Sequence, residues 1–232
     1  MRIRSVLGDT PKLLAMIAGR PYLDHLLDWL RCFGARRVLL GLGYQAKAVV
    51  DYLQLHPRSD LKLSYAIEPR PLGTAGALRF ARSELRSDPV LVINGDSFAG
   101  ADLCGMVQRQ RDGGASGTVL CTEVADAGRY GRVILDQTGS IQRFVEKDAT
   151  FQGPALVNAG VYLLSATLLD QIAHDDSTSL ENDVFERLPQ GSLLAFTGQF
   201  QFIDIGTPES LAIARAMFES GMGALQGAKE TL

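Results

Sequence analysis

The chain has 232 residues, of which 46% are hydrophobic and 21% are charged, and its formal net charge at pH 7 is −3. These values describe an ordinary globular protein and, because the basic residues are scattered, they argue against a nucleic-acid partner. The apolar runs fall short of the roughly 18 residues that a membrane span needs, and residues 1–4 do not begin a signal peptide, so we expect a cytoplasmic protein without a membrane partner.

Helix-like and strand-like patterns alternate through the first half of the chain. Helical spacing of apolar residues predicts helices over residues 21–33, 46–53, 74–85 and 103–111. Short apolar or alternating runs predict strands over residues 38–40, 61–67 and 89–93. Strands separated by helices imply right-handed crossovers and a mostly parallel sheet flanked by helices.

The second half of the chain has a different pattern. It predicts strands over residues 116–123, 131–135, 141–146 and 156–164, and helices over residues 166–172 and 182–188. A hairpin-like pair over residues 193–196 and 200–205 precedes a last helix from residue 208. We expect one continuous domain over residues 1–220 with an antiparallel extension, and a frayed tail over residues 221–232.

The apolar run of residues 89–93 is followed directly by Asn94, Gly95 and Asp96. Five apolar residues in a row fit a strand buried on both faces. In open α/β sheets ligands bind beyond the carboxyl ends of the strands, so Asp96 is a candidate ligand for Mg²⁺. A cap on the following turn or helix explains Asp96 equally well.

Asp204 also ends a strand-like run, and it precedes a helix start with Thr207 as the expected N-cap and Pro208 as the first helical residue. Asp204 and Asp96 could share one Mg²⁺ ion if their strands lie side by side. The sequence alone does not show whether the strands are neighbours.

The segment of residues 68–77 connects a predicted strand to a predicted helix. It holds two prolines, which stiffen the chain, and small residues that allow close approach to the backbone. The following helix N-terminus offers N–H groups, so the segment suits a flat base or a phosphate. A rigid connector is the commoner explanation for such a segment.

Three further segments are candidates for binding a phosphorylated ligand. Lys147 follows Glu146 at a strand end and could hold a phosphate as a point charge, although a solvated surface pair is commoner. Gly160 interrupts an apolar strand and indicates either close approach of a ligand or a bulge. Tyr130 and Gly131, before another strand, are equally ambiguous.

Residues 41–46 match the pattern G-x-G-x-x-A after a strand and before a helix, with Glu68 about 25 residues further on. This pattern is found at dinucleotide-binding sites but has a high false-positive rate. The three histidines and three cysteines are isolated in the sequence, so they indicate structural or surface residues and reduced thiols. An oxidoreductase with a dinucleotide cofactor is therefore a distant alternative.

Taken together, the segments resemble the sugar-1-phosphate nucleotidyltransferase family. The motifs, in order, are PK at 11–12, AGRPYLDHLLDWL at 18–30, EPRPLGTAGAL at 68–78, NGDS at 94–97, RYGRV at 129–133, VEK at 145–147, VNAGVYLL at 157–164 and FIDIGTPE at 202–209. Each motif is weak by itself, but their order is a strong signal. The branch that looks most similar is the D-glycero-α-D-manno-heptose-1-phosphate guanylyltransferases, and short uridylyltransferases look almost as similar.

The resemblance implies a Rossmann-like, mostly parallel mixed sheet with a small antiparallel sugar-binding extension. It implies transfer of a nucleotidyl group from a nucleoside triphosphate, with GTP favoured, to a sugar 1-phosphate, with a heptose favoured, for cell-surface polysaccharide synthesis. It implies Mg²⁺ held by Asp96 and Asp204, and catalytic roles for Arg2, Lys12, Asp96 and Lys147. The implied nucleotide contacts are Glu68, Gly73, Thr74, Ala75, Gly76 and Asn94. The implied sugar-phosphate contacts are Tyr130, Gly131, Glu146, Lys147, Asn158 and Asp204.

The sequence departs from the family pattern at its start. Family members open with a buried strand and a glycine-rich loop before the PK motif, whereas residues 1–4 here align with the end of that loop, where Arg2 matches its arginine. We therefore expect the first strand of the family fold to be missing. The alternative function is a catalytically inactive homologue that binds nucleotide sugars. We favour an enzyme, because Lys12, Asp96, Lys147 and Asp204 are all retained. Homo-oligomerisation is left open.

Overall fold

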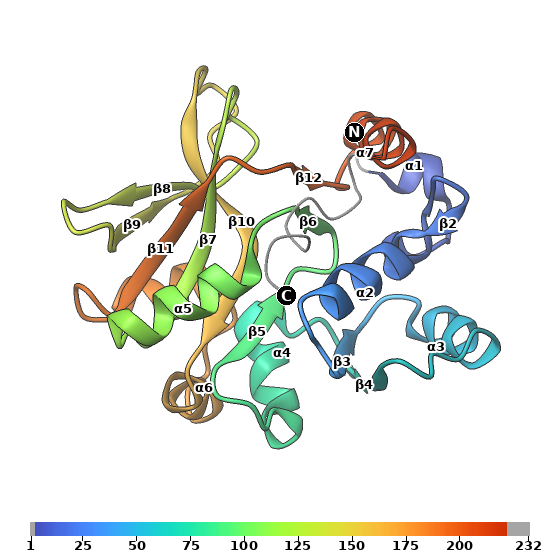
Figure 1. Cartoon of the computed structure of the whole chain (residues 1–232), viewed down its shortest axis with the longest axis horizontal. Coiled ribbons are helices and arrows are strands. Elements are labelled where there is room, and N and C mark those ends of the chain that lie inside the picture. Colours follow the sequence, from blue (N-terminus) through green and yellow to red (C-terminus); the bar gives the residue numbers. More distant parts are fainter. Residues whose placement is uncertain (1–2, 222–232) are drawn as a thin grey trace. The chain divides into compact units, whose positions relative to one another are not determined.

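The computed structural model describes residues 3–221, and its contacts group the chain into two compact units. Unit 1 comprises the residues up to 71, 95–101 and those from 201 on, and unit 2 comprises residues 72–94 and 102–200. Figure 1 shows the elements of both units in the colours of the sequence. A single domain over residues 1–220 stays a prediction, and the predicted tail lies outside the described residues from 222 on.

Unit 1 begins with short elements and then forms a small parallel sheet. Its N-terminal elements are α1 (Arg4–Leu7), the 3-10 helix η1 (Lys12–Leu14), the antiparallel pair β1 (Met16–Ile17) and β2 (Arg20–Pro21), and α2 (Tyr22–Cys32). The sheet pairs β3 (Arg37–Leu42) with β4 (Lys62–Ile67) in parallel, and α3 (Ala46–Leu55) connects them. As the apolar spacing of α2 predicts, its buried side chains lie on one helical face, and they include Leu23, Leu27 and Trp29.

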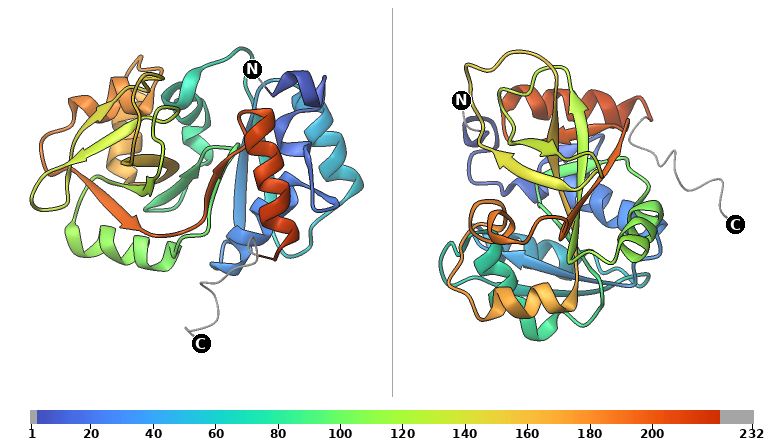
Figure 2. Two further views of the ribbon diagram at one scale, coloured as in Figure 1. Left: turned by 90° about the horizontal axis from the view of Figure 1, so that it is seen from above. Right: turned by 90° about the vertical axis from the view of Figure 1, so that its left-hand side faces the viewer.

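The later segments of unit 1 add two strands and a helix. The strands β6 (Ser97–Ala99) and β12 (Phe202–Asp204) pair antiparallel, and α7 (Pro208–Glu219) follows. The predicted helix start is confirmed: the Thr207 side chain accepts a hydrogen bond from the Ser210 backbone N–H in a capping box, and Pro208 is the first helical residue. Figure 2 shows α7 beside the N-terminal elements of unit 1, where Arg215 Nε donates to Met16 O.

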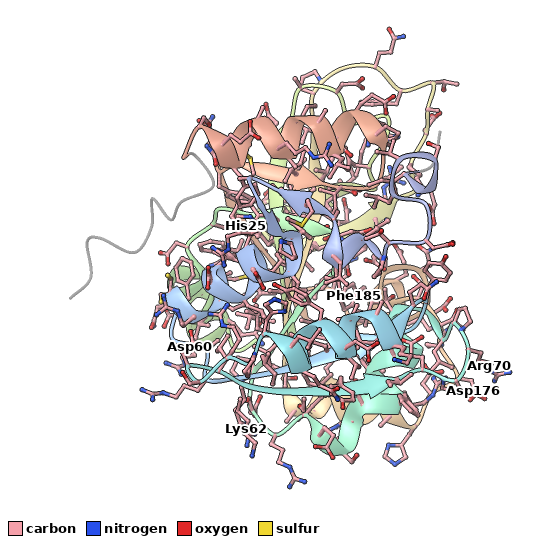
Figure 3. The ribbon with its side chains drawn as sticks, turned by 90° about the vertical axis from the view of Figure 1, so that its right-hand side faces the viewer. His25, Asp60, Lys62, Arg70, Asp176 and Phe185 are labelled. Carbon is pink, nitrogen blue, oxygen red and sulfur yellow. The ribbon has the colours of Figure 1, made fainter. Side chains whose placement is uncertain are left out.

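The histidines have structural roles, as the sequence predicts. His25 of α2, labelled in Figure 3, has its Nε2 2.9 Å from Ile17 O, and its ring centroid lies 4.4 Å from that of Phe218. The Nδ1 atoms of His56 and His174 each lie at hydrogen-bond distance from a backbone oxygen four residues earlier.

No helix within residues 3–221 has both the length and the apolar character to cross a bilayer.

Unit 2 is built on one six-stranded sheet with the order β11-β7-β10-β8-β9, in which β5 also pairs with β10. Its strands are β5 (Val90–Ile93), β7 (Gly117–Val124), β8 (Arg132–Leu135), β9 (Ile141–Val145), β10 (Ala155–Leu164) and β11 (Leu193–Gly198). Its helices are α4 (Gly73–Ala81), η2 (Arg82–Glu84), α5 (Leu103–Gly113), α6 (Ala166–Ala173), the π-helix η3 (Leu180–Val184) and the 3-10 helix η4 (Phe185–Arg187). Figure 1 shows β11, β7 and β10 side by side.

The α/β fold class is confirmed, but the sheets are more antiparallel than the alternation of strands and helices predicts. Within unit 2 only β11 and β7 run parallel, because β10 pairs antiparallel with β5, β7 and β8. Among the described residues β3 pairs with β4 alone and β5 with β10 alone, and no strand precedes β1.

The predicted hairpin of residues 193–196 and 200–205 is wrong. The first strand, β11, pairs in parallel with β7 in unit 2, whereas β12 pairs with β6 in unit 1. The two predicted strands are adjacent in the sequence, and local pattern could not show that each finds a distant partner. The short strand β6 was not predicted either, because Ser97–Ala99 has no length for a periodic pattern.

Candidate active site

The two aspartates singled out in the sequence lie side by side in unit 1. In the β6–β12 ladder Asp204 is opposite Ser97, the residue that follows Asp96. One step beyond the ladder, the Ile205 backbone N–H donates to the backbone oxygen of Asp96 at 2.9 Å. The backbones of Asp96 and Asp204 are therefore neighbours in a small sheet of two strands, and their joint binding of a metal ion stays a prediction.

Lys12 reaches the same place from the N-terminal part of unit 1. Its Nζ donates to Asp96 Oδ2 at 2.8 Å, and both side chains are between one third and two fifths exposed. An ion pair this exposed contributes only about 0–1 kcal/mol to stability. Both charges are therefore accessible to a ligand, and Lys12 can exchange its carboxylate partner for a phosphate at small cost.

Gly206 makes room for the Asp204 carboxylate. A Cβ atom at position 206 would lie 3.4 Å from Asp204 Oδ2 but only 2.8 Å from Oδ1, which is closer than a carbon and an oxygen pack. The glycine therefore lets the chain turn from β12 into α7 while the carboxylate folds back over it.

A buried phenol lies close to both carboxylates. Tyr22, at the first position of α2, is fully buried, and its hydroxyl has no hydrogen-bond partner among the described residues. Burial raises the pKa of Tyr22 well above its ordinary value, and the negative charges of Asp96 and Asp204 raise it further. Tyr22 therefore stays protonated and uncharged beside the two carboxylates. It was missed from the sequence because its position fits the apolar face of a helix.

The donor set around these aspartates fits a magnesium ion that also binds a ligand phosphate. Mg²⁺ is commonly held by one or two carboxylates and completes its coordination with water and phosphate oxygens. Asp96 and Asp204 supply two such carboxylates, and no group of three or more His, Cys, Asp or Glu side chains suited to a metal occurs within residues 3–221. The site thus suits a shared ion better than a metal cage made by protein alone.

The candidate sugar-phosphate residues of unit 2 lie before β8, after β9 and in β10, whereas Asp204 lies in unit 1. The Asn158 backbone N–H donates to Gly131 O at 3.2 Å, and Gly131 lies next to the end of β9, since a Cβ there would be 3.8 Å from Val145 O. Glu146 follows β9, and its Oε1 accepts from Asn182 Nδ2 at 2.6 Å. Lys147 and Tyr130 flank this group in sequence, and Lys147 is exposed.

The Gly73–Gly76 segment differs from the prediction in its local contacts. The Ala75 backbone N–H donates to Thr178 O, and the Thr74 hydroxyl accepts from the Leu180 backbone N–H, so Thr74 is not the N-cap of α4. Gly73 has a φ of +76° and lies against Thr178. Part of the polar backbone that we expected to bind a base or a phosphate is therefore already hydrogen-bonded within the protein.

The remaining predicted residues lie in separate places. Glu68 follows β4 in unit 1, and its Oε2 lies 3.9 Å from where a Cβ of Gly43 would be. The structure therefore places Glu68 beside the G-x-G-x-x-A segment, as the dinucleotide-site alternative also required. Asn94 ends β5 in unit 2, and Arg2 lies outside the described residues.

The sequence profile of the nucleotidyl transferase family matches residues 7–220. This chain belongs to that family. The mannose-1-phosphate guanylyltransferase catalytic subunit beta of Drosophila melanogaster is 32% identical over 232 aligned residues, which cover 98% of this chain and 62% of the relative. The mannose-1-phosphate guanylyltransferase 1 of Arabidopsis thaliana is 30% identical over 213 residues, which cover 89% and 58%. The chain thus spans about three fifths of the length of these curated relatives.

Solved structures give the same assignment. The crystal structure of HddC from Yersinia pseudotuberculosis has a TM-score of 0.84 and 32% sequence identity, and the match covers 94% of both chains. A second HddC structure, complexed with GMP-PN, has a TM-score of 0.83 at the same identity. The resemblance to sugar-1-phosphate nucleotidyltransferases and the Rossmann-like α/β fold class are therefore confirmed.

Gly206→Ala tests how closely the metal-binding geometry depends on the space above Asp204. The added Cβ forces the carboxylate to rotate, so we expect Mn²⁺, used as a probe for Mg²⁺, to bind about 10-fold more weakly. Titration followed by electron paramagnetic resonance measures the free ion. Gly41→Ala is the matched control, because a Cβ at position 41 meets nothing within 4 Å. Equal affinity for Mn²⁺ in both variants would show that Asp204 does not bind the ion.

The buried phenols make stability fall at alkaline pH. The pKa of Tyr22 and that of Tyr162, mainly through burial, are raised well above the value of about 10 that the unfolded chain has. The contribution of these two pKa shifts to the unfolding free energy is complete below pH 10 and is lost as pH rises from there toward the folded pKa. Each phenol lowers the unfolding free energy by up to about 1.4 kcal/mol per pH unit in that window. Urea unfolding between pH 9 and 11 checks this, and Tyr162→Phe should flatten the slope.

Proposed function

We propose that the chain transfers a nucleotidyl group from a nucleoside triphosphate, with GTP favoured, to a sugar 1-phosphate, and releases pyrophosphate. The observation that carries this proposal is the Lys12–Asp96 ion pair beside Asp204, because two carboxylates and a cation are what a reacting triphosphate requires. GTP is supported by the guanylyltransferase names of the curated relatives and by the HddC complex with GMP-PN. The resemblance favours a heptose, and the relatives' names add mannose as a competing sugar.

The proposed reaction needs no protein nucleophile. A phosphate oxygen of the sugar 1-phosphate attacks the α-phosphorus of the triphosphate, and the bond from that phosphorus to the bridging oxygen breaks with departure of pyrophosphate. Charge neutralisation and alignment are the main requirements. Mg²⁺ held by Asp96 and Asp204 would supply part of the neutralisation when bound. Lys12 supplies a further positive charge at the phosphates, and the exposed Lys147 would hold the phosphate of the sugar.

The experiment is a screen of the full chain with Mg²⁺. GTP, ATP, UTP and CTP are each paired with heptose, mannose and glucose 1-phosphates, and released pyrophosphate is measured by a coupled phosphate assay. We expect turnover with GTP and with either the heptose or the mannose phosphate. No pyrophosphate from any pair would remove the enzyme proposal. Binding of a nucleotide sugar without turnover would support the inactive homologue, and protection by NAD but not by GTP would support an oxidoreductase.

Lys12→Gln tests the role of the ion pair in turnover. Loss of one preformed charge contact at the reacting phosphates should lower kcat by about 10²–10³, and Asp96→Ala should cost a similar factor. Lys47→Gln is the control, because Lys47 is paired with Asp51 at 2.6 Å and is highly exposed on the same unit. A loss of less than tenfold in Lys12→Gln, with an unchanged melting temperature, would exclude Lys12 from the reacting centre.

A further inference from the structure

Three polar side chains meet at one buried hydroxyl in unit 2. Tyr162, in β10, is fully buried, and its O–H donates to Glu181 Oε1 at 2.5 Å. The Tyr162 hydroxyl oxygen accepts from Asn158 Nδ2 at 2.9 Å, and the Asn94 side chain is another hydrogen-bond partner of this hydroxyl. Buried polar groups are mostly hydrogen-bonded within the protein, and here the four side chains bond to one another.

The network sits at an irregularity of β10. On β7, Val119 and Cys121 pair with Tyr162 and Asn158, so three residues of β10 bulge opposite a single residue of β7. At the centre, Gly160 has a φ of +72°. Its backbone N–H donates to Asn158 Oδ1 at 2.9 Å, and its carbonyl accepts from the Asn94 backbone N–H at 2.8 Å. The bulge therefore fixes both asparagines to the same strand.

Glu181 and the Gly160 backbone N–H act on opposite sides of the Asn158 amide and together set which way it faces. One Asn158 Nδ2 hydrogen is directed to Tyr162 and the second to Glu181 Oε1, at 3.1 Å, while Oδ1 accepts from Gly160. A carboxylate only accepts hydrogen bonds, so Glu181 requires the amine side of Asn158 to face it. The lone pair that remains on Asn158 Oδ1 is then a fixed acceptor of the kind that binds a hydroxyl group.

The backbone around Glu181 is itself held firmly. Glu181 lies in the π-helix η3, whose N-cap Ser179 accepts from the Asn182 backbone N–H. The Asp183 carboxylate accepts from the backbone N–H groups of Thr178 and Ser179 at 2.8 and 2.9 Å. The Ser179 hydroxyl donates to Glu181 Oε2 at 3.3 Å. These contacts limit the movement of Glu181, so its carboxylate stays in place beside the Asn158 amide.

We propose that Glu181 is a positioning residue, which fixes the Asn158 amide so that its oxygen accepts a hydrogen bond from a sugar hydroxyl. This proposal rests on the proposed function, since it assigns Asn158 to the sugar 1-phosphate. Glu181 acts through Asn158 directly, whereas it reaches Asn94 only through Tyr162. Its loss therefore affects the sugar side of the reaction more than the nucleotide side.

The first test does not depend on turnover. In ¹H–¹⁵N spectra of the full chain, the Asn158 side-chain amide should shift clearly in Glu181→Ala and Glu181→Gln. It should stay in place in Glu186→Gln, because Glu186 accepts instead from the Phe144 backbone N–H. An unchanged Asn158 resonance in both Glu181 variants would overturn the proposal, and it would do so even if the wild-type chain showed no turnover.

The second test separates positioning from a merely structural role. We expect Glu181→Ala to raise KM for the sugar 1-phosphate about 10- to 100-fold, as small misplacements of binding groups do, with KM for the nucleotide changed less than threefold. Glu181→Gln keeps an acceptor oxygen and should fall between wild type and alanine. A lower melting temperature with both KM values unchanged would contradict positioning. If Glu181→Ala does not fold, Glu181→Gln and Tyr162→Phe give the same comparison, and Tyr162→Phe should change both KM values.

Discussion

A three-residue antiparallel ladder between β6 and β12 is the interaction on which the candidate site depends. It is short, and it joins segments about a hundred residues apart in the chain. Its register sets Asp204 opposite Ser97 and lets Ile205 bond to the backbone of Asp96. A shift of one residue would place Asp204 opposite a different residue and would break the backbone bond from Ile205 to Asp96. The position of the charges is therefore a consequence of backbone pairing.

Around that ladder, exposed charged side chains lie next to a buried side chain that carries no charge. Lys12 and Asp96 remain accessible, whereas Tyr22 is fully buried beside the same carboxylates. Burial keeps the phenol protonated, so it adds no negative charge that would compete with Asp96 for Lys12. Unit 2 uses a buried phenol differently, since the Tyr162 hydroxyl is fully engaged with its polar neighbours. The Tyr22 hydroxyl thus has no partner among the described residues, whereas the Tyr162 hydroxyl is held by its polar neighbours.

The sequence predicted most regular elements because their apolar periodicity is local. The helix α2 and the strands β5 and β10 lie close to their expected ranges. Pairing of β11 and β12 could not be predicted in that way, because each finds a partner far away in the chain. The motifs identified Asp96, Asp204 and Asn158, which are polar residues in apolar surroundings. Glu181 and Gly206 were missed, since a carboxylate in a polar segment and a glycine after an aspartate look like ordinary turn residues.

The order of segments in unit 1 has a consequence for biosynthesis. Residues 201–219 complete this unit, and they emerge from the ribosome after all of unit 2. Until then β6 has no partner strand, Asp96 lacks its neighbouring carboxylate, and the face of α2 that meets Phe218 is uncovered. Contacts between such distant segments form slowly, so Asp96 and Asp204 come together only after all of unit 2 has been made. Termination at codon 202 would therefore yield a polypeptide that contains unit 2 and Asp96 but lacks Asp204.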